Sequence, residues 1–127
     1  MNKALVLDAG ALIAVERRSV KIQALLLTAR ERQASVVVPT PVVAQVVREG
    51  GRQVGLRRFL ADSYLRFAGL DYPMALEIGA LLGRSGTADV VDACVAICAQ
   101  HLGHCPVVTS DPGDLRKLGP TLPLIVV

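Results

Sequence analysis

The sequence has 127 residues, 52% of them hydrophobic but only 3% aromatic, which suits one domain with a core of Val, Leu, Ala and Ile. This composition excludes disordered, collagen-like and disulfide-rich proteins. The net charge is only +3, yet residues 1–66 hold 11 basic and 5 acidic side chains while residues 67–127 hold 3 and 6. Most of the basic side chains in the first half are arginines, which suit phosphate contacts, although a solvated helix surface gives the same pattern.

The first half of the chain predicts three strands separated by pairs of helices. In chain order these are a strand over 3–8, helices over 11–18 and 19–32, a strand over 35–39, helices over 40–50 and 53–61, and a strand over 64–70. Ser19 is a typical N-cap, and Thr40 followed by Pro41 predicts another. The Gly50-Gly51 pair predicts where the helix that begins at Thr40 ends.

The second half predicts helices over 72–83 and 89–101, a strand over 106–111, a helix over 112–118 and a strand over 124–127. Asp71 is a typical cap for the first of these helices, and the second has so few charges that we expect it to be buried. Buried apolar strands that alternate with helices are typical of an α/β domain with a mostly parallel central sheet between two layers of helices. No repeat or linker divides the chain, so we expect a single domain over residues 1–127.

Five aspartates are expected at one edge of this sheet. Asp8 and Asp111 each end a strand, and the carboxyl ends of parallel strands gather functional groups. Asp89 and Asp92 lie one helical turn apart at the start of the buried helix, and Asp114 follows Asp111 at the same spacing. Asp89 and Asp111 also suit plain N-caps, whereas Asp8 and Asp92 stand in apolar runs that would desolvate them. Clustered carboxylates without histidine favour Mg²⁺ or Mn²⁺ over zinc.

Such a site typically serves phosphoryl chemistry, and the basic half of the chain would guide a polyanion toward it. The glycine-rich dinucleotide motif, the P-loop and the serine-hydrolase elbow are all absent from the sequence.

A second group of side chains looks like a metal site but lacks the paired spacing of structural zinc sites. It consists of Cys94, Cys98, His101, His104 and Cys105. We interpret the cysteines as small core residues and the histidines as exposed. Three clustered cysteines fit a reducing compartment, and no apolar run is long enough to span a membrane. We therefore expect a soluble, cytoplasmic protein without a membrane partner.

Four segments resemble the PIN-domain ribonucleases, and most closely the VapC-like toxins of bacterial toxin–antitoxin pairs. They are LVLDAGALIAVE, VPTPVVAQVVREGGRQ, GTADVVDACVAICAQ and VVTSDPGDLRKL. The resemblance covers essentially the whole chain, with the motifs in family order. It implies a small PIN-like domain, endoribonuclease activity that depends on Mg²⁺ or Mn²⁺, a homodimer, and neutralisation by a VapB-like antitoxin.

The resemblance also implies roles for the aspartates. By position, Asp8, Asp92 and Asp111 match the family's catalytic, metal-holding acids. Asp89 and Asp114 match accessory acids present in only some members, and we expect Asp89 to be a further metal ligand. The implied reaction is hydrolysis of an RNA phosphodiester that leaves a 5′-phosphate and a 3′-hydroxyl.

One position departs from the family pattern. The family usually has Glu in the helix after the second strand, where VVAQVVR places Gln45. An amide oxygen can still coordinate a metal ion, but it carries no charge. Glu49 lies four residues further on, which predicts a place one turn along the same helix face, so both residues are candidates for an accessory role.

We interpret the chain as a toxin-type, metal-dependent endoribonuclease. Arg48, Arg52, Arg57 and Arg58 are the candidates for contacts with the RNA backbone. The alternative, favoured by Gln45, is a catalytically weak PIN module that binds RNA or a protein partner without cleavage. A nuclease that acts on DNA is a third interpretation, because a fold alone does not choose the nucleic acid.

Overall fold

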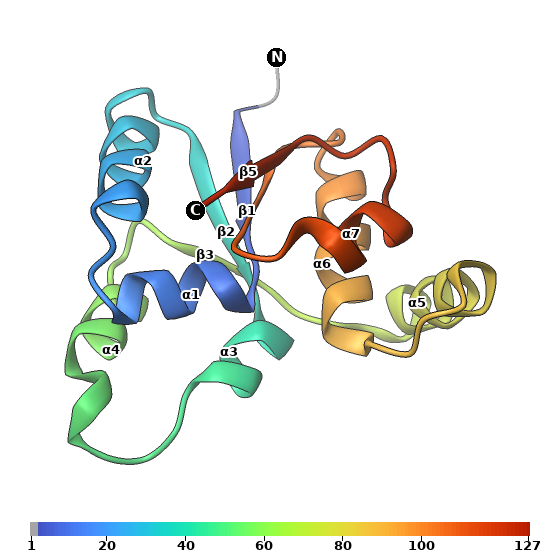
Figure 1. Cartoon of the computed structure of the whole chain (residues 1–127), viewed down its shortest axis with the longest axis horizontal. Helices are drawn as coiled ribbons and strands as arrows, with labels where there is room; N and C mark the ends of the chain where they lie inside the picture. The colour runs from blue at the N-terminus through green and yellow to red at the C-terminus, as the bar shows by residue number, and fades with distance from the viewer. Residues whose placement is uncertain (1–2) are drawn as a thin grey trace.

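A computed structural model describes residues 3–127 of the chain (Figure 1). The strands in this part are β1 (Ala4–Leu7), β2 (Ser35–Pro39), β3 (Arg66–Ala68), β4 (Val107–Thr109) and β5 (Leu124–Val126). The helices are α1 (Ala9–Glu16), α2 (Val20–Glu31), α3 (Thr40–Val46), the short 3-10 helix η1 (Gly51–Gln53), α4 (Val54–Leu60), α5 (Tyr72–Ser85), α6 (Val90–His101) and α7 (Pro112–Leu118). Their order is the one that the sequence predicts.

The five strands form one sheet in the order β3-β2-β1-β4-β5, and every neighbouring pair is parallel. Helices flank it on both sides, with α1, α2 and α4 to one side and α5, α6 and α7 to the other (Figure 1). The predicted α/β class is therefore confirmed. In the centre of the sheet, Val6 of β1 pairs with Val37 of β2 and Val107 of β4. This register places the carboxyl ends of β1 and β4 side by side.

Helix α6 fills the centre of one helical layer, as its low charge predicts. It packs on β1, β2 and β4, and its residues Ala93 to Ala99 are all buried. Cys94, Cys98 and Cys105 are free and buried, and burial raises the pKa of the Cys94 thiol to about 11. A thiol with so high a pKa stays protonated near neutral pH and packs as a small apolar group, as predicted. Both histidines of the segment are exposed.

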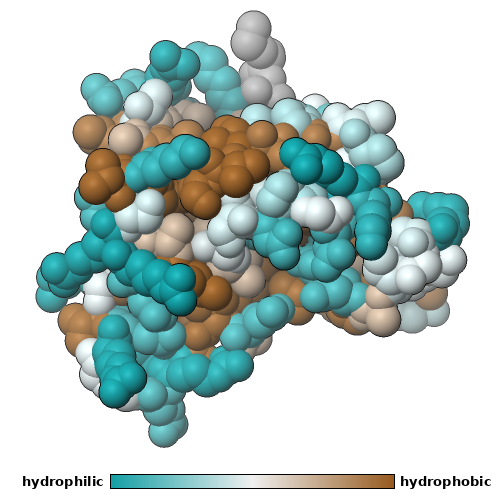
Figure 2. Space-filling model, in the orientation of Figure 1, coloured by the Kyte–Doolittle hydropathy of each residue, from teal (hydrophilic) through white to brown (hydrophobic). Residues whose placement is uncertain are grey.

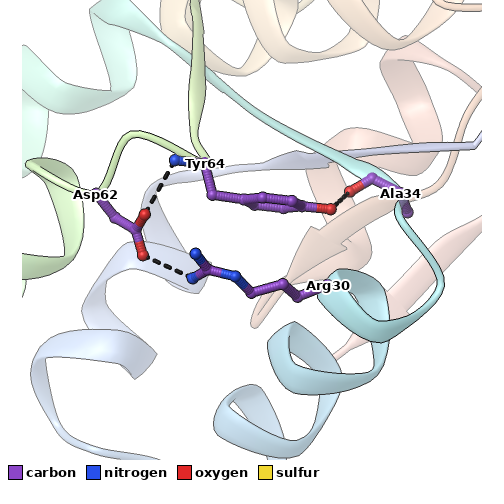
Figure 3. Close-up of polar contacts among 4 residues, drawn as sticks. All are labelled: Arg30, Ala34, Asp62 and Tyr64. Atoms are coloured by element: carbon purple, nitrogen blue, oxygen red, sulfur yellow. Dashed lines mark hydrogen bonds and ion pairs between the residues drawn. The ribbon is translucent and has the colours of Figure 1, made fainter.

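The end of α2 is tied to the connection between α4 and β3 (Figure 3). The guanidinium of Arg30 donates to Asp62 Oδ2 at 2.8 Å and lies 4.8 Å from the centre of the Tyr64 ring. Asp62 Oδ1 accepts from the Tyr64 N–H at 2.9 Å, and the Tyr64 hydroxyl donates to the Ala34 carbonyl. These contacts fix α4 beside α2, on the side of the sheet that also holds α1.

Helix α3 differs from its prediction at both ends. Its N-cap is Pro39 rather than Thr40, and no side chain caps it. The helix ends at Val46, before the Gly50-Gly51 pair, because Val47 is extended. The N–H of Arg48 does not continue the helical pattern but donates to the side chain of Gln53 at 2.8 Å. A loop therefore follows α3 where four more helical residues were predicted.

The predicted strands over 64–70 and 106–111 are shorter than expected, since only three residues of each pair with a neighbour. In the described part of the chain, no helix is long and apolar enough to cross a bilayer.

Candidate active site

Asp8 is held rigidly where β1 meets α1. It is the N-cap of α1, its Oδ1 accepts from the Ala11 N–H at 2.9 Å, and only 6% of the residue is exposed. Thr109, at the end of β4, also hydrogen-bonds to this carboxylate. Burial raises the pKa of Asp8 above its usual value, the hydrogen bonds lower it in part, and the charge of Asp111 raises it further. The desolvation predicted from its apolar run is confirmed.

A close approach of backbones brings Asp111 toward Asp8. A Cβ atom at Gly10 would overlap the side chain of Ser110, so only glycine lets the start of α1 lie against the β4–α7 connection. Asp111 is the N-cap of α7, and its Oδ1 accepts from the Gly113 N–H at 3.3 Å. The N–H of Asp111 donates to Thr109 Oγ1 at 3.0 Å, which fixes the turn.

Asp92 faces the other four aspartates from the first turn of α6. Asp89 caps this helix and accepts from the Asp92 N–H through Oδ1 at 2.9 Å. Burial raises the pKa of Asp92 to about 6, together with the charges of Asp89, Asp8, Asp114 and Asp111. The structure therefore brings together all five aspartates that the sequence placed at this edge. Three of them are N-caps: Asp89 and Asp111, for which the sequence suggested it, and Asp8.

We call these five side chains the acidic cluster: Asp8, Asp89, Asp92, Asp111 and Asp114. The ion pairs within residues 3–127 join Arg30 to Asp62 and His101 to Glu77, so neither neutralises the cluster. Repulsion among uncompensated carboxylates is what a divalent cation relieves, and oxygen-only donors suit Mg²⁺ or Mn²⁺. In residues 3–127, no three acidic, cysteine or histidine side chains are arranged so that they could all bind one metal ion. The charge of the cluster thus fits a divalent cation, and three-ligand coordination requires side-chain movement.

Comparison with solved structures finds close matches in fold. VapBC2 from Rickettsia felis, bound to a DNA fragment from its promoter, matches with a TM-score of 0.75 at 17% identity over 98% of each chain. FitAcB from Neisseria gonorrhoeae matches with a TM-score of 0.64 at 18% identity, over 95% of this chain and 96% of that one. PAE2754 from Pyrobaculum aerophilum matches with a TM-score of 0.63 at 20% identity, over 98% of this chain and 92% of that one.

The protein has a PIN-like fold. No family model matches the sequence, and comparison with curated proteins finds no significant relative. The likeness thus lies in the three-dimensional arrangement, which spans nearly the whole length of the solved structures.

Gln45 and Glu49, the two candidates for an accessory role in the segment after β2, lie apart. Gln45 is exposed on α3 and lines a cavity together with Ala9, the neighbour of Asp8. Glu49 does not lie one turn further along α3, because that helix ends at Val46. It lines a separate cavity with the Gly50-Gly51 pair, so the prediction of a shared helix face is wrong.

The four arginines proposed for RNA contacts are all exposed, on α4 and on the loop before it. Arg48 folds back, so that its Nη1 donates to the carbonyls of Val47 at 2.8 Å and Ala44 at 3.2 Å. Arg57 Nη2 donates to the Arg48 carbonyl at 2.6 Å. Arg48 and Arg57 therefore help to shape the loop after α3, while Arg52 lines the same cavity as Glu49.

Sequence reasoning missed Glu16, Arg17 and Gln53. All three line the cavity that holds Gln45. The spacing of Ala9, Ile13 and Glu16 puts them on one face of α1, a signal that was available. Gln53 had no such signal, because its role depends on how the loop folds back onto α1.

Proposed function

We propose that the protein is a metal-dependent endoribonuclease that acts in the cytoplasm as the toxin of a VapBC-type pair. The observation that carries the proposal is the acidic cluster, in which burial and four neighbouring charges raise the pKa of Asp92 to about 6. The sequence resemblance to VapC-like toxins supports the same activity, as does the likeness in fold to VapBC2 over 98% of the chain. A VapB-like antitoxin and a second copy of the chain are the proposed protein partners.

The five aspartates have two kinds of role in this proposal. Asp8, Asp92 and Asp111 would hold Mg²⁺ or Mn²⁺, with Asp89 and Asp114 assisting. The bound ion would polarise the scissile phosphate and lower the pKa of the attacking water. Asp8 is preorganised, since its hydrogen bond to the Ala11 N–H and its burial fix its position. A bound cation would lower the pKa of Asp92, because it neutralises the charges around this carboxylate.

The substrate would approach from the arginine-rich side of the site. Arg48, Arg52, Arg57 and Arg58 are exposed, and guanidinium groups match the geometry of phosphate oxygens. They would hold the RNA backbone while the acidic cluster faces the scissile phosphate. Binding through phosphates weakens as salt rises, because each contact releases condensed counterions.

Mn²⁺ titration and RNA cleavage test this proposal on one set of variants. Millimolar Mn²⁺ should raise the melting temperature of the wild type, because a ligand that binds only the folded state stabilises it. Asp92→Asn should lose both the thermal shift and cleavage, whereas Glu31→Gln, which changes an exposed acid on α2, should keep both. A wild type that neither cleaves RNA nor responds to Mn²⁺ would overturn the proposal.

A second candidate function is RNA or partner binding without cleavage. The observation that favours it is Gln45, since an uncharged amide replaces the glutamate usual at this position. The variant Gln45→Glu separates the two functions. Under the nuclease proposal it should tighten Mn²⁺ binding about tenfold or more, because a further carboxylate attracts the cation. RNA binding without Mn²⁺-dependent cleavage, in the wild type and in this variant, would favour the binding module. Incubation with single-stranded DNA of the same sequence tests the third interpretation, a nuclease that cleaves DNA.

A further inference from the structure

Two adjoining cavities lie next to the acidic cluster, on the side of α1 and α3. The first has a volume of about 340 Å³ and begins at Ala9, directly after Asp8. The second has a volume of about 350 Å³ and lies within the loop between α3 and α4, which passes below α1 in Figure 1. Glu16, Arg48 and Gln53 line both, so the two cavities share a wall, and we call the pair the groove. Each is at the small end of the range for ligand sites, roughly 300 to 1,000 Å³.

Hydrogen bonds of Gln53 fix the wall that the cavities share. Its Nε2 donates to Glu16 Oε1 at 2.7 Å and to the Val46 carbonyl at 3.0 Å, while its Oε1 accepts from the Arg48 N–H at 2.8 Å. The carboxylate of Glu16 is therefore oriented before any ligand binds. This bond uses Oε1, and a carboxylate has further acceptor capacity on its other oxygen. A preorganised acceptor selects among ligands more sharply than a mobile one.

Two side chains of the first cavity, Glu16 and Arg17, carry the kinds of hydrogen-bonding group that recognise guanine. A carboxylate such as that of Glu16 can accept from the N1–H and the 2-amino group of this base. An arginine such as Arg17 can donate two hydrogen bonds to O6 and N7, the commonest specific contact between arginine and a base. Ala9, Ile13 and Val46 supply apolar surface for the base plane. Adenine has no hydrogen on N1 and no carbonyl at C6, so it lacks both sets of contacts.

The second cavity has two arginines and two glutamates in its lining, Arg48, Arg52, Glu16 and Glu49, so their charges balance. Gly50 and Gly51 also line it, and they have no side chain to keep a ligand away from their backbone. A phosphate of the same nucleotide would lie on the side of Arg52. We propose that this groove binds one guanine nucleotide of the RNA strand, with the base read by Glu16 and Arg17 and its phosphate beside Arg52. The inference rests on the proposed function, because it deepens it by naming the nucleotide that the enzyme selects beside the scissile bond.

Gln45 fits this assignment better than a glutamate would. It lines the first cavity together with Glu16. A second carboxylate there could only accept hydrogen bonds, whereas an amide both donates and accepts them.

Binding is measured in EDTA, so that cleavage cannot interfere. The probes are six-nucleotide uridine strands in which one internal position is guanosine, inosine or adenosine. Their binding to wild-type protein is measured by fluorescence anisotropy. Inosine differs from guanosine only by the missing 2-amino group, so it should bind about tenfold more weakly, as loss of a hydrogen bond to a charged group predicts. Adenosine should bind more weakly still. Equal affinities for the three strands, or no binding of any of them at millimolar concentration, would overturn the proposal.

Variants separate reading of the base from support of the loop. Glu16→Gln keeps an oxygen for the Gln53 amide but replaces one acceptor with a donor, so guanosine and inosine should bind alike. Glu31→Gln is the matched control and should keep the preference. If Glu16→Gln instead lowers the affinity for all three strands by the same factor, Glu16 only supports the loop. That result would contradict the proposal. Cleavage of RNA with no preference for guanosine would support the nuclease proposal and refute the guanine site. Preferential binding of the guanosine strand with no cleavage would support the guanine site and refute the nuclease proposal.

Discussion

Asp92 differs from the other members of the acidic cluster because its half-buried carboxylate feels the charges of all four. The apolar run around it and its spacing from Asp89 were visible in the sequence, and they predicted both its desolvation and its neighbour. The charges of Asp8, Asp111 and Asp114 reach it only through the parallel pairing of β1 with β4. Sequence reasoning could therefore name the residues of the site, but Asp92 emerges as its electrostatic centre only from the folded arrangement.

The raised pKa of Asp92 predicts how stability without metal depends on pH. A carboxyl whose pKa is higher in the folded state than in the unfolded state stabilises the fold fully below about 4, and this contribution is lost as pH rises through about 6. The shift corresponds to about 3 kcal/mol, which solvent screening of a half-buried group reduces to about 1–2 kcal/mol. Asp92→Asn should therefore raise the melting temperature in EDTA at pH 8, and by about half as much at pH 5.

The exposed Glu31→Gln variant is the control for this measurement and should be neutral at both pH values. An Asp92→Asn protein that is less stable than wild type at pH 8 would show that the carboxylate is held by favourable contacts rather than strained by repulsion.

Helix α3 and the loop after it show which element boundaries could not be predicted from the sequence. Strand 35–39 and helix 112–118 have the predicted bounds, since their apolar runs, proline and caps act locally. The end of α3 does not follow from such local signals. The N–H of Arg48 is taken by Gln53, five residues later, and Gln53 is itself held by Glu16 of α1. This tertiary contact, and not the glycine pair, therefore determines where α3 ends. The same contact fixes the wall that the two cavities share.

Gln53→Ala tests whether this side chain holds the loop. The variant loses hydrogen bonds at a partly buried site, so the free energy of unfolding should fall by about 1–3 kcal/mol. Amide hydrogen exchange should become faster over residues 48–53 while α6 stays protected. Gln23→Ala, at an exposed position of α2, is the matched control and should change neither quantity. Unchanged exchange in Gln53→Ala would mean that the loop is held by other contacts, among them Arg57 with the Arg48 carbonyl.

On the scale of the whole molecule, one part of the exposed hydrophobic surface lies on α2 and α4. Val20 and Leu27 of α2 are 81% and 62% exposed, and Val54 of α4 is 54% exposed. A cavity of about 580 Å³ lies between α1, α2 and α4, with Leu26 and Phe59 among its lining. Figure 2 shows hydrophobic side chains over α2 and β5 on the face in view. Contiguous apolar surface of this kind is typical of an interaction site.

The segments 19–32 and 53–61 mix long apolar side chains with arginines, and this pattern predicts a symmetric dimer through this face. Wild-type protein should have the mass of two chains by light scattering at micromolar concentration. Leu27→Asp should give the mass of one chain, because a buried, unpaired carboxylate in a two-fold interface is costly and occurs twice. Leu76→Asp is the matched control, since Leu76 is 58% exposed on α5, away from this face. Dissociation by Leu76→Asp in place of Leu27→Asp would move the interface to α5, and a wild type with the mass of one chain would refute the dimer.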